Sequence, residues 1–351
     1  MEGIKVHFSA RKMLFRADTV RAIDGVSLNL ERGETVSFVG ESGSGKTTLG
    51  RASLRLAPIT EGTVVFDGVD ITNTHEGKLR WFRRRAQAVF QDPYSSIDPF
   101  MDVRQVLEEP LLIHGIQDRD DRVRHALEEV RLSPAGEFAV KFPHMLSGGQ
   151  RQRVGIARAL IMQPNYILAD EPVSMIDASS RTEILYLMRE LQERLGIAFL
   201  YITHDIATAR YFSDRIAVLY LGRVAEQGPP AEVLDDPLHP YTVALIEAVP
   251  EADPDNRLRD RPTVPGEPPN PVNVPTGCRF HPRCPQFMAG QCDVVEPELI
   301  EARPGRYVAC HLFTPMENAD GPVHPSTGSG RTAGAGSGRT EGSAPSNQTE
   351  E

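Results

Sequence analysis

The stretch Gly40-Glu41-Ser42-Gly43-Ser44-Gly45-Lys46-Thr47-Thr48 decides how the rest of the chain is interpreted. It follows the apolar run 35–39 and leads into the segment 49–54, which is the order strand, glycine-rich loop, helix. Glycines let the backbone curve around a phosphate without Cβ clashes, and the first N–H groups of the helix favour an anion there. Lys46 can reach the β- and γ-phosphates of a nucleotide, and the Thr47 hydroxyl can bind Mg²⁺. The alternative is a chance glycine turn, and the flanking strand and helix favour phosphate binding.

The composition is that of a soluble chain with one large domain and appendages: 351 residues, 40% hydrophobic and 25% charged. The net charge of −10 does not favour a nucleic-acid partner. The N-terminus lacks the apolar core of a signal peptide, and no run approaches the roughly 20 apolar residues that span a bilayer. We therefore expect a cytoplasmic chain, with any membrane spans in other subunits.

Two apolar strands end in polar residues. The run 166–169 ends at Asp170 and Glu171, and the run 198–202 is followed by His204. Parallel α/β sheets place ligands at the carboxyl ends of their strands. One carboxylate can then hold Mg²⁺ through water and the other can accept a proton from attacking water, while His204 is a candidate phosphate sensor. A solvated acidic turn and a structural histidine are the alternatives.

The motif Leu146-Ser147-Gly148-Gly149-Gln150 precedes a helical segment at 151–160. Ser147 is a good N-cap, and the glycines leave backbone N–H groups open. An anion is favoured in front of such a helix, although a simple capped loop fits the residues equally well.

Other segments predict the surrounding elements. Short strands are expected at 4–8, 26–30, 62–66, 216–220 and 223–228. The gaps between the early strands suggest a partly antiparallel sheet near the N-terminus, and the last two form a hairpin. Helices are expected over 103–131, with Val123, Leu127 and Val130 on one face, and over 181–195, with Ile184, Met188, Leu191 and Leu195 in one core stripe.

These motifs occur in the order of an ABC-type ATPase, and the chain resembles that family over residues 4–313. The order is the phosphate loop, Gln91, the motif 146–150, the two acids and His204. The resemblance implies an α/β P-loop fold with a mixed sheet core, an antiparallel β subdomain and a helical subdomain at about 92–160, all within residues 1–250.

The stretches 221–229, 236–242 and 266–285 are similar to the ATP-binding subunits of oligopeptide and dipeptide importers. The resemblance implies an extension of that subgroup at 251–313. The Gly- and Ser-rich segment 314–351 is predicted to be a disordered tail.

The family resemblance implies that ATP lies between the phosphate loop of one subunit and the motif 146–150 of another. Lys46 then holds ATP, while Thr47, Gln91 and Asp170 organise Mg²⁺. Glu171 polarises water and His204 contacts the γ-phosphate, so the catalytic set is Lys46, Gln91, Glu171 and His204.

Two further positions are assigned by the resemblance. Asp177 belongs to a dimer-contact loop, in which Val173-Ser174-Met175-Ile176 departs from the usual Thr-Ser-Ala-Leu. Phe8 is expected to stack on adenine, with Phe15 as the alternative.

The implied function is an ATP-hydrolysing subunit that energises a membrane importer for oligopeptides or dipeptides from the cytoplasmic face. The implied partners are a second ATPase subunit (a paralogue rather than a second copy), membrane-spanning permeases and, indirectly, an extracytoplasmic substrate-binding protein. Nickel or another small solute is an alternative cargo. A soluble ABC ATPase that acts on DNA or ribosomes is an alternative class, and it usually carries insertions that this sequence lacks.

All four cysteines lie in the predicted extension: Cys278, Cys284, Cys292 and Cys310. Clustered cysteines in a reducing compartment indicate metal or cluster ligation before disulfides. In the importer subgroup they resemble the ligands of a 4Fe–4S cluster. Zinc is the alternative, with His281 and His311 available for a mixed site, and free thiols are the third.

Overall fold

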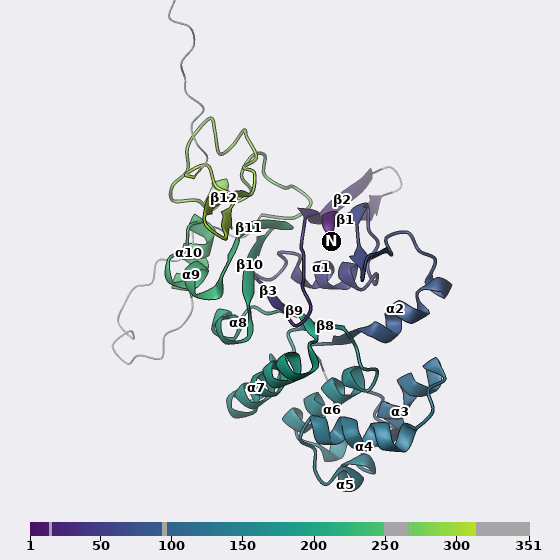
Figure 1. Cartoon of the computed structure of the whole chain (residues 1–351). Helices are drawn as coiled ribbons and strands as arrows, with labels where there is room; N and C mark the ends of the chain where they lie inside the picture. The colour runs from purple at the N-terminus through teal and green to yellow at the C-terminus, as the bar shows by residue number, and fades with distance from the viewer. Residues whose placement is uncertain (14–15, 93–96, 249–265, 267–268, 314–351) are drawn as a thin grey trace, which may run out of the picture. The chain divides into compact units, whose positions relative to one another are not determined.

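The computed structural model describes residues 1–13, 16–92, 97–248, 266 and 269–313 (Figure 1). The predicted tail 314–351 lies outside these residues, as do Phe15 and most of the proline-rich stretch that opens the predicted extension.

A central sheet carries the phosphate loop. Within the described residues its order is β12-β13-β11-β10-β3-β9-β8-β7. The parallel strands are β10 (Arg215–Tyr220), β3 (Thr35–Val39), β9 (Ala198–Ile202), β8 (Tyr166–Asp170) and β7 (Ala86–Val89). The antiparallel strands are β11 (Arg223–Gly228), β13 (Arg306–Val308) and β12 (Ile300–Arg303). The predicted mixed sheet and the hairpin of β10 and β11 are confirmed.

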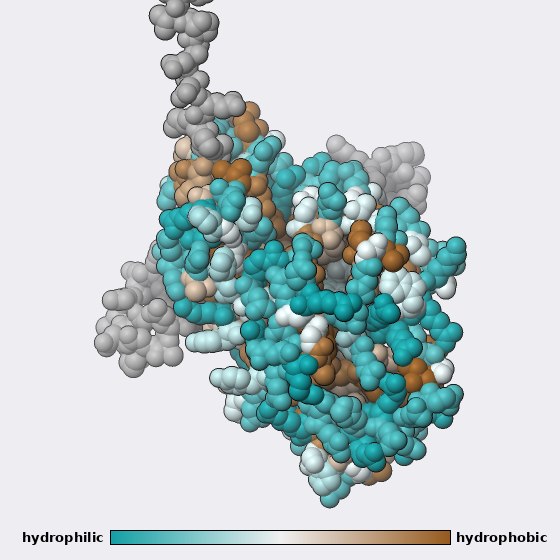
Figure 2. All heavy atoms as spheres, in the orientation of Figure 1, coloured by the Kyte–Doolittle hydropathy of each residue, from teal (hydrophilic) through white to brown (hydrophobic). Residues whose placement is uncertain are grey.

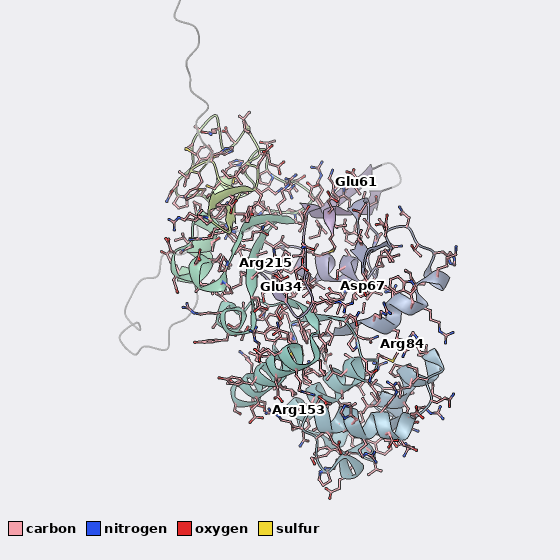
Figure 3. All side chains as sticks on the ribbon, in the orientation of Figure 1. Glu34, Glu61, Asp67, Arg84, Arg153 and Arg215 are labelled. Carbon is pink, nitrogen blue, oxygen red and sulfur yellow. The ribbon has the colours of Figure 1, made fainter. Side chains whose placement is uncertain are left out.

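The register brings the site-bearing loops to one edge. Phe38 near the end of β3 and Asp170 at the end of β8 both pair with Ile202 at the end of β9. The loops that follow these strands therefore leave the sheet side by side. An ion pair at the other end of β3 joins Glu34 to Arg215 on β10, with 2.9 Å between Oε1 and Nε (Figure 3).

Alternate residues of the strands pack on two different layers, as the pleat of a strand requires. Leu168 and Leu200 face α1 (Lys46–Ser53) and the N-terminal strands. Ile167 and Phe199 face α6 (Gly148–Leu160) and α7 (Ala178–Leu195). Covered faces on both sides explain why these parallel strands are apolar throughout.

The N-terminal sheet has the order β2-β1-β4, and its pairing is antiparallel as predicted. Its strands are β1 (Glu2–Met13), β2 (Arg16–Val26) and β4 (Glu61–Thr63). The strand predicted at 26–30 is wrong, because β2 already ends at Val26.

The strand predicted at 62–66 is confirmed except for its continuity, since Val64 divides it between β4 and β5 (Val65–Phe66). β5 pairs with β6 (Val69–Asp70) through a tight turn. Asp67 and Gly68 both have positive φ there, 47° and 77°, which is the conformation of a two-residue hairpin.

The helical subdomain packs α3 (Val103–His114), α4 (Arg119–Glu129) and α5 (Ala135–Ala139) against α6. The segment 103–131 is helical as predicted, but it forms the two helices α3 and α4 and not one. Gly115, with φ 68°, ends α3 in the left-handed conformation. The predicted buried face of Val123, Leu127 and Val130 is confirmed.

Helix α7 links this subdomain to the sheet. Its predicted stripe of Ile184, Met188 and Leu191 is buried, but Leu195 is 47% exposed because it is the last helical residue before Gly196. Arg153 on α6 donates to Val130 O and to Glu183 on α7, both at 2.9 Å (Figure 3).

The predicted extension adds β12 and β13 to the central sheet. Arg306 on β13 is 1% exposed, and its Nη2 donates to Oε1 of the fully buried Glu226 on β11 at 2.8 Å. The Glu226 carboxylate also accepts the N–H groups of Leu238 and His239. This network joins the extension to the end of the core.

The remaining short elements are η1 (Glu76–Lys78), α2 (Arg80–Arg85), η2 (Pro143–Met145), α8 (Ile206–Phe212), α9 (Pro230–Asp235), α10 (Pro240–Glu247) and η4 (His281–Arg283). Across the described ranges, none of the helices has both the length and the apolarity to cross a bilayer.

Candidate nucleotide site

The glycines of the phosphate loop are required by its backbone. Gly40 and Gly45 have φ values of 148° and 106°, which side-chain-bearing residues rarely adopt. A Cβ at Gly40 would lie 2.3 Å from Leu219 O, and one at Gly45 would lie 2.3 Å from Ala22 O. Gly45 is also the N-cap of α1 and supplies no side-chain cap, so the first N–H groups of the helix are available to an anion.

Lys46 lies inside the curve of this loop. Its Nζ donates to Gly40 O at 2.8 Å and to Glu41 O at 2.9 Å, and the residue is 6% exposed. Burial lowers the pKa of Lys46, while nearby carboxylates act in the opposite direction. The ammonium group of Lys46 thus lies inside the loop with neutral carbonyls as its partners, and the charged oxygens of a phosphate would bind it more strongly.

Thr47 and Asp170 form the oxygen-rich part of the site. The Thr47 hydroxyl donates to Asp170 Oδ1 at 3.1 Å. Burial raises the pKa of Asp170, and the Thr47 hydroxyl bond opposes that shift. A hydroxyl and a carboxylate oxygen suit Mg²⁺, which is usually held by few protein ligands together with phosphates and water.

One carboxylate oxygen of Glu171 contacts two further residues of the predicted site. Its Oε2 accepts Gln91 Nε2 at 2.9 Å and lies 3.1 Å from His204 Nδ1. The backbone of Glu171 has a left-handed φ of 49°, and its N–H donates to Ile202 O at 2.8 Å. The sheet therefore fixes the carboxylate at the same edge as Asp170.

Lys46, Thr47, Gln91, Glu171 and His204 face a common cavity of about 480 Å³. It is lined by Val20, Ala22, Ser42, Gly43, Gly45, Lys46, Thr47, Thr48, Gln91, Glu171, His204 and Pro271. Of the predicted residues, this lining contains Ser42, Gly43, Gly45, Lys46, Thr47, Thr48, Gln91, Glu171 and His204, whereas Gly40, Glu41, Ser44 and Asp170 lie outside it.

Val20, Ala22 and Pro271 in that lining were missed by sequence reasoning. Small and apolar side chains carry no chemical signature, and Pro271 reaches the cavity by a long-range contact in which its carbonyl accepts Arg21 N–H at 3.3 Å. Phe8 pairs with Val20 but does not line the cavity, and it is 39% exposed. Its stacking role stays a prediction.

The motif 146–150 lies elsewhere, beside Asp177. Ser147 caps α6 as predicted: its Oγ accepts Gln150 N–H at 3.2 Å, and its own N–H donates to the Gln150 side chain at 3.0 Å. A Cβ on Gly149 would lie 3.1 Å from Ser180, which follows the Asp177 cap of α7. Hydrogen bonds from Ser179 and Ser180 lower the pKa of Asp177 to about 2. Neither Ser147, Gly148, Gly149, Gln150 nor Asp177 lines the cavity around the phosphate loop.

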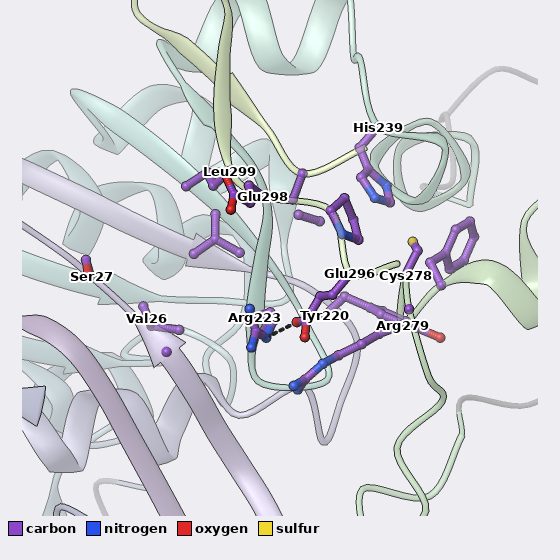
Figure 4. A pocket seen from close by; sticks show the side chains of 17 residues that line it. Val26, Ser27, Tyr220, Arg223, His239, Cys278, Arg279, Glu296, Glu298 and Leu299 are labelled. Atoms are coloured by element: carbon purple, nitrogen blue, oxygen red, sulfur yellow. Dashed lines mark ion pairs between the residues drawn. The ribbon is translucent and has the colours of Figure 1, made fainter. Parts of the chain in front are cut away.

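Of the four cysteines of the extension, Cys278 lines a cavity of about 490 Å³ (Figure 4). An ion pair between Arg223 and Glu296 borders this cavity. Cys278 N–H donates to Cys292 O at 2.8 Å.

Burial raises the pKa of Cys278 to about 11 and that of Cys310 to about 11, and the other cysteines add to both shifts. Within the described ranges, however, no group of three or more His, Cys, Asp or Glu side chains has an arrangement that could hold a metal ion. The positions therefore do not fit a cluster or zinc as they stand, and ligation at the cysteines is not supported by this arrangement.

Comparison with known proteins places this geometry in a family. The ABC transporter family matches residues 23–174, and the family described as the oligopeptide/dipeptide transporter, C-terminal region, matches residues 225–292. The oligopeptide transport ATP-binding protein AppF of Bacillus subtilis is 44% identical over 321 residues, which cover 90% of this chain and 97% of AppF. The chain belongs to the ABC transporter ATP-binding proteins of the oligopeptide/dipeptide subgroup.

Solved ABC structures agree with this assignment. A dimeric ATP-binding cassette in a post-hydrolysis state, bound to ADP and phosphate, is similar with a TM-score of 0.58 and 32% identity over 65% of this chain and 97% of the other. The cbiO1 protein of Clostridium perfringens, part of an ABC transporter complex, gives 0.57 and 30% over 67% of this chain and 91% of the other.

As an ABC ATPase, the chain binds ATP and hydrolyses it for transport. ABC ATPases dimerise and work with permease subunits in importer complexes.

Proposed function

We propose that this ABC ATPase energises a peptide importer at the cytoplasmic face of the membrane, as one half of a pair of ATP-binding subunits. The observation that carries the proposal is the contact of Gln91 and His204 with one oxygen of Glu171, at the mouth of the phosphate loop. This arrangement unites a proton acceptor with groups that can sense a terminal phosphate.

Each group has a role that its contacts support. Lys46 and the N–H groups of the loop bind the phosphates. Thr47 and Asp170 would hold Mg²⁺, which would supply positive charge that neutralises the phosphates. Glu171 orients and deprotonates water, and His204 contacts the γ-phosphate. Gln91 connects the site to the segment that follows β7.

The second half of the site comes from another subunit. Ser147 and Gly149 lie at the open start of α6, apart from the cavity of their own chain. A head-to-tail pair places this helix start against the γ-phosphate bound by the partner, where the helix dipole favours it. Asp177 lies beside the same surface and contributes to the pair interface. We expect the second subunit to be a paralogue.

Glu171→Gln tests the reaction. The amide keeps the shape and the hydrogen bonds but cannot accept a proton, so turnover falls by about a hundredfold or more while ATP binding remains. We expect an ATP-dependent dimer to accumulate, measured by size exclusion with light scattering.

Glu183→Gln is the matched control for this experiment. Glu183 is an exposed acid on α7 that pairs with Arg153, and its substitution leaves turnover unchanged. Normal turnover in Glu171→Gln would remove Glu171 as the base.

A groove of about 260 Å³ supports docking of the membrane-spanning partner next to Gln91. It lies between the core and the helical subdomain, and its apolar lining includes Leu56, Phe90 and Ile97. Figure 2 shows hydrophobic side chains gathered in a hollow between the region of α2 and the helices of the subdomain. We propose that a cytoplasmic segment of the permease occupies this groove and senses nucleotide through Gln91.

The match of residues 225–292 to the oligopeptide/dipeptide transporter C-terminal region supports peptides as cargo. The test is ATP-driven uptake of labelled di- and oligopeptides by proteoliposomes that contain the purified complex. Uptake of nickel without peptide would overturn this part of the proposal.

We infer a 4Fe–4S cluster at Cys278, Cys284, Cys292 and Cys310, with zinc as the alternative, from the resemblance to the importer subgroup and from the rise in the pKa of Cys310 to which the other three cysteines contribute. The described arrangement contains no group of metal ligands, so metal binding would require these side chains to rearrange. Iron, sulfide and zinc analysis of anaerobically purified protein tests it, and protein free of all three would reject both.

A further inference from the structure

The extension makes direct contact with the phosphate loop. Arg283, on η4, donates from Nη1 to Glu41 Oε2 at 2.9 Å and from Nη2 to Glu41 Oε1 at 3.1 Å. Two parallel bonds between a guanidinium and a carboxylate form the strongest and most directional kind of ion pair. Arg283 is 6% exposed and Glu41 is 26% exposed, so solvent screens this pair only in part.

A second group holds the main chain of the same loop residue. Glu41 N–H donates to the hydroxyl of Tyr241 at 2.9 Å. Tyr241 is 1% exposed and packs against Tyr220 and Phe280, with ring centroids 4.5 and 5.4 Å away. The Tyr220 hydroxyl in turn lies 3.4 Å from Arg283 Nη1. The carboxylate and the N–H of Glu41 are therefore both fixed by residues from the C-terminal third of the chain.

Glu41 passes this constraint to the phosphate-binding lysine. Its carbonyl accepts Lys46 Nζ at 2.9 Å, while its side chain lies outside the lining of the nucleotide cavity. If Arg283 were absent, the Glu41 carboxylate would be unpaired next to the place where phosphates bind. The negative charge of Glu41 would then repel the phosphates, and the loop would lose its hydrogen bonds to Arg283.

We propose that Arg283 is a positioning residue for ATP binding, which neutralises Glu41 and fixes the phosphate loop from outside. The extension is thereby a working part of the nucleotide site. Pro271 supports the same conclusion at another point, because it lines the cavity and its carbonyl accepts Arg21 N–H on β2. The inference rests on the proposed nucleotide site and adds a determinant of its affinity.

The test measures binding of a fluorescent ATP analogue to the full chain. Arg283→Gln raises the Kd about tenfold, because the Glu41 carboxylate is left without its counter-ion beside the bound phosphates. Turnover at saturating ATP stays close to that of the wild type, because bound phosphates order the loop. Arg303→Gln is the matched control, since Arg303 is an exposed arginine of the extension that pairs with Asp236. The control leaves the Kd unchanged.

A double-mutant cycle separates positioning from a general effect on folding. In the Glu41→Gln background, the additional Arg283→Gln change has little further effect on Kd, because the charge that Arg283 neutralises is gone. An equal loss in both backgrounds, or an unchanged Kd in folded Arg283→Gln, overturns the proposal. If thermal melting shows that Arg283→Gln does not fold, Arg283→Lys takes its place in the cycle, with a smaller rise in Kd expected. Failure of the wild type to bind the analogue would instead reject the nucleotide site itself.

Discussion

Among the described residues, charged side chains are buried at the loop edge of the sheet and between core and extension, and they are paired differently in the two regions. At the loop edge of the sheet, Lys46 donates to main-chain carbonyls and Asp170 accepts a hydroxyl. Between core and extension, Arg306 meets Glu226 and Arg279 meets Asp24, so each guanidinium has its own carboxylate.

This difference in pairing distinguishes charges that are available to bind a ligand from charges that stabilise the fold. A buried charge without a full counter-ion costs stability in the unliganded chain, and a ligand of opposite charge removes that cost. A buried pair satisfies itself and joins two segments. Glu41 belongs to both regions, because its side chain is paired with the extension while its main chain holds Lys46.

The largest effect is expected at the structural pair. Glu226→Gln removes the buried counter-ion of Arg306 and leaves the exposed carboxylates of Asp236 and Glu232 as its charged partners, so the free energy of unfolding falls by about 3 to 5 kcal/mol. Denaturant titration followed by circular dichroism measures it. Glu232→Gln is the control, because Glu232 is exposed and 4.0 Å from Arg306 Nε. A wild-type midpoint for Glu226→Gln would show that this pair is not structural.

The opposite pattern is expected at the loop edge. Lys46→Met lowers ATP affinity about a hundredfold, through loss of a charged phosphate contact. The free energy of unfolding without nucleotide does not fall, because burial disfavours the charged form of Lys46 in the folded chain. A large loss of stability, measured by the same titration, would contradict the distinction between the two regions.

The stability of the junction between core and extension is expected to depend on pH, which tests the comparison further. Burial lowers the pKa of His239 to about 4, so the folded chain protonates this histidine at a lower pH than the unfolded chain does. Stability present above the ordinary pKa of about 6.5 is therefore lost as pH falls toward 4, by about 2 kcal/mol at pH 5.

Unfolding titrations at pH 7 and pH 5 check this expectation. His239→Asn keeps an acceptor for Tyr241 N–H but does not titrate, so its stability changes less between the two pH values. An equal change in both proteins would exclude His239 as the cause.

The sequence predicted those parts of the fold that local chemistry specifies. The glycines of the phosphate loop, the acids that end β8 and the cap at Ser147 depend on short-range geometry, and the structure has each of them. The errors fall where tertiary contacts decide. The run 26–30 is apolar enough for a strand, but Leu28 N–H instead donates to Met1 O at 2.9 Å. Gly115 divides a long helical pattern because it adopts the left-handed conformation.

The site shows the same division. Lys46, Thr47, Glu171 and His204 carry recognisable chemistry, and they line one cavity. Arg283 could not be connected with the loop, since 242 residues separate it from Glu41 and an arginine near cysteines has many explanations. Four cysteines in one segment likewise suggest ligation, but their spacing in sequence does not fix the distances between sulfur atoms.

Pairing of β13 with β11 has a consequence for solubility. β11 carries Val224 and Ala225 and has β10 on its other side, so without β13 its open N–H and C=O groups would form an exposed sheet edge. Exposed apolar edges recruit strands from other molecules. On this side of the sheet the outermost strand is instead β12, which is only 4 residues long and carries the exposed charges Glu301 and Arg303. The extension thus gives the sheet a short, charged boundary that resists aggregation.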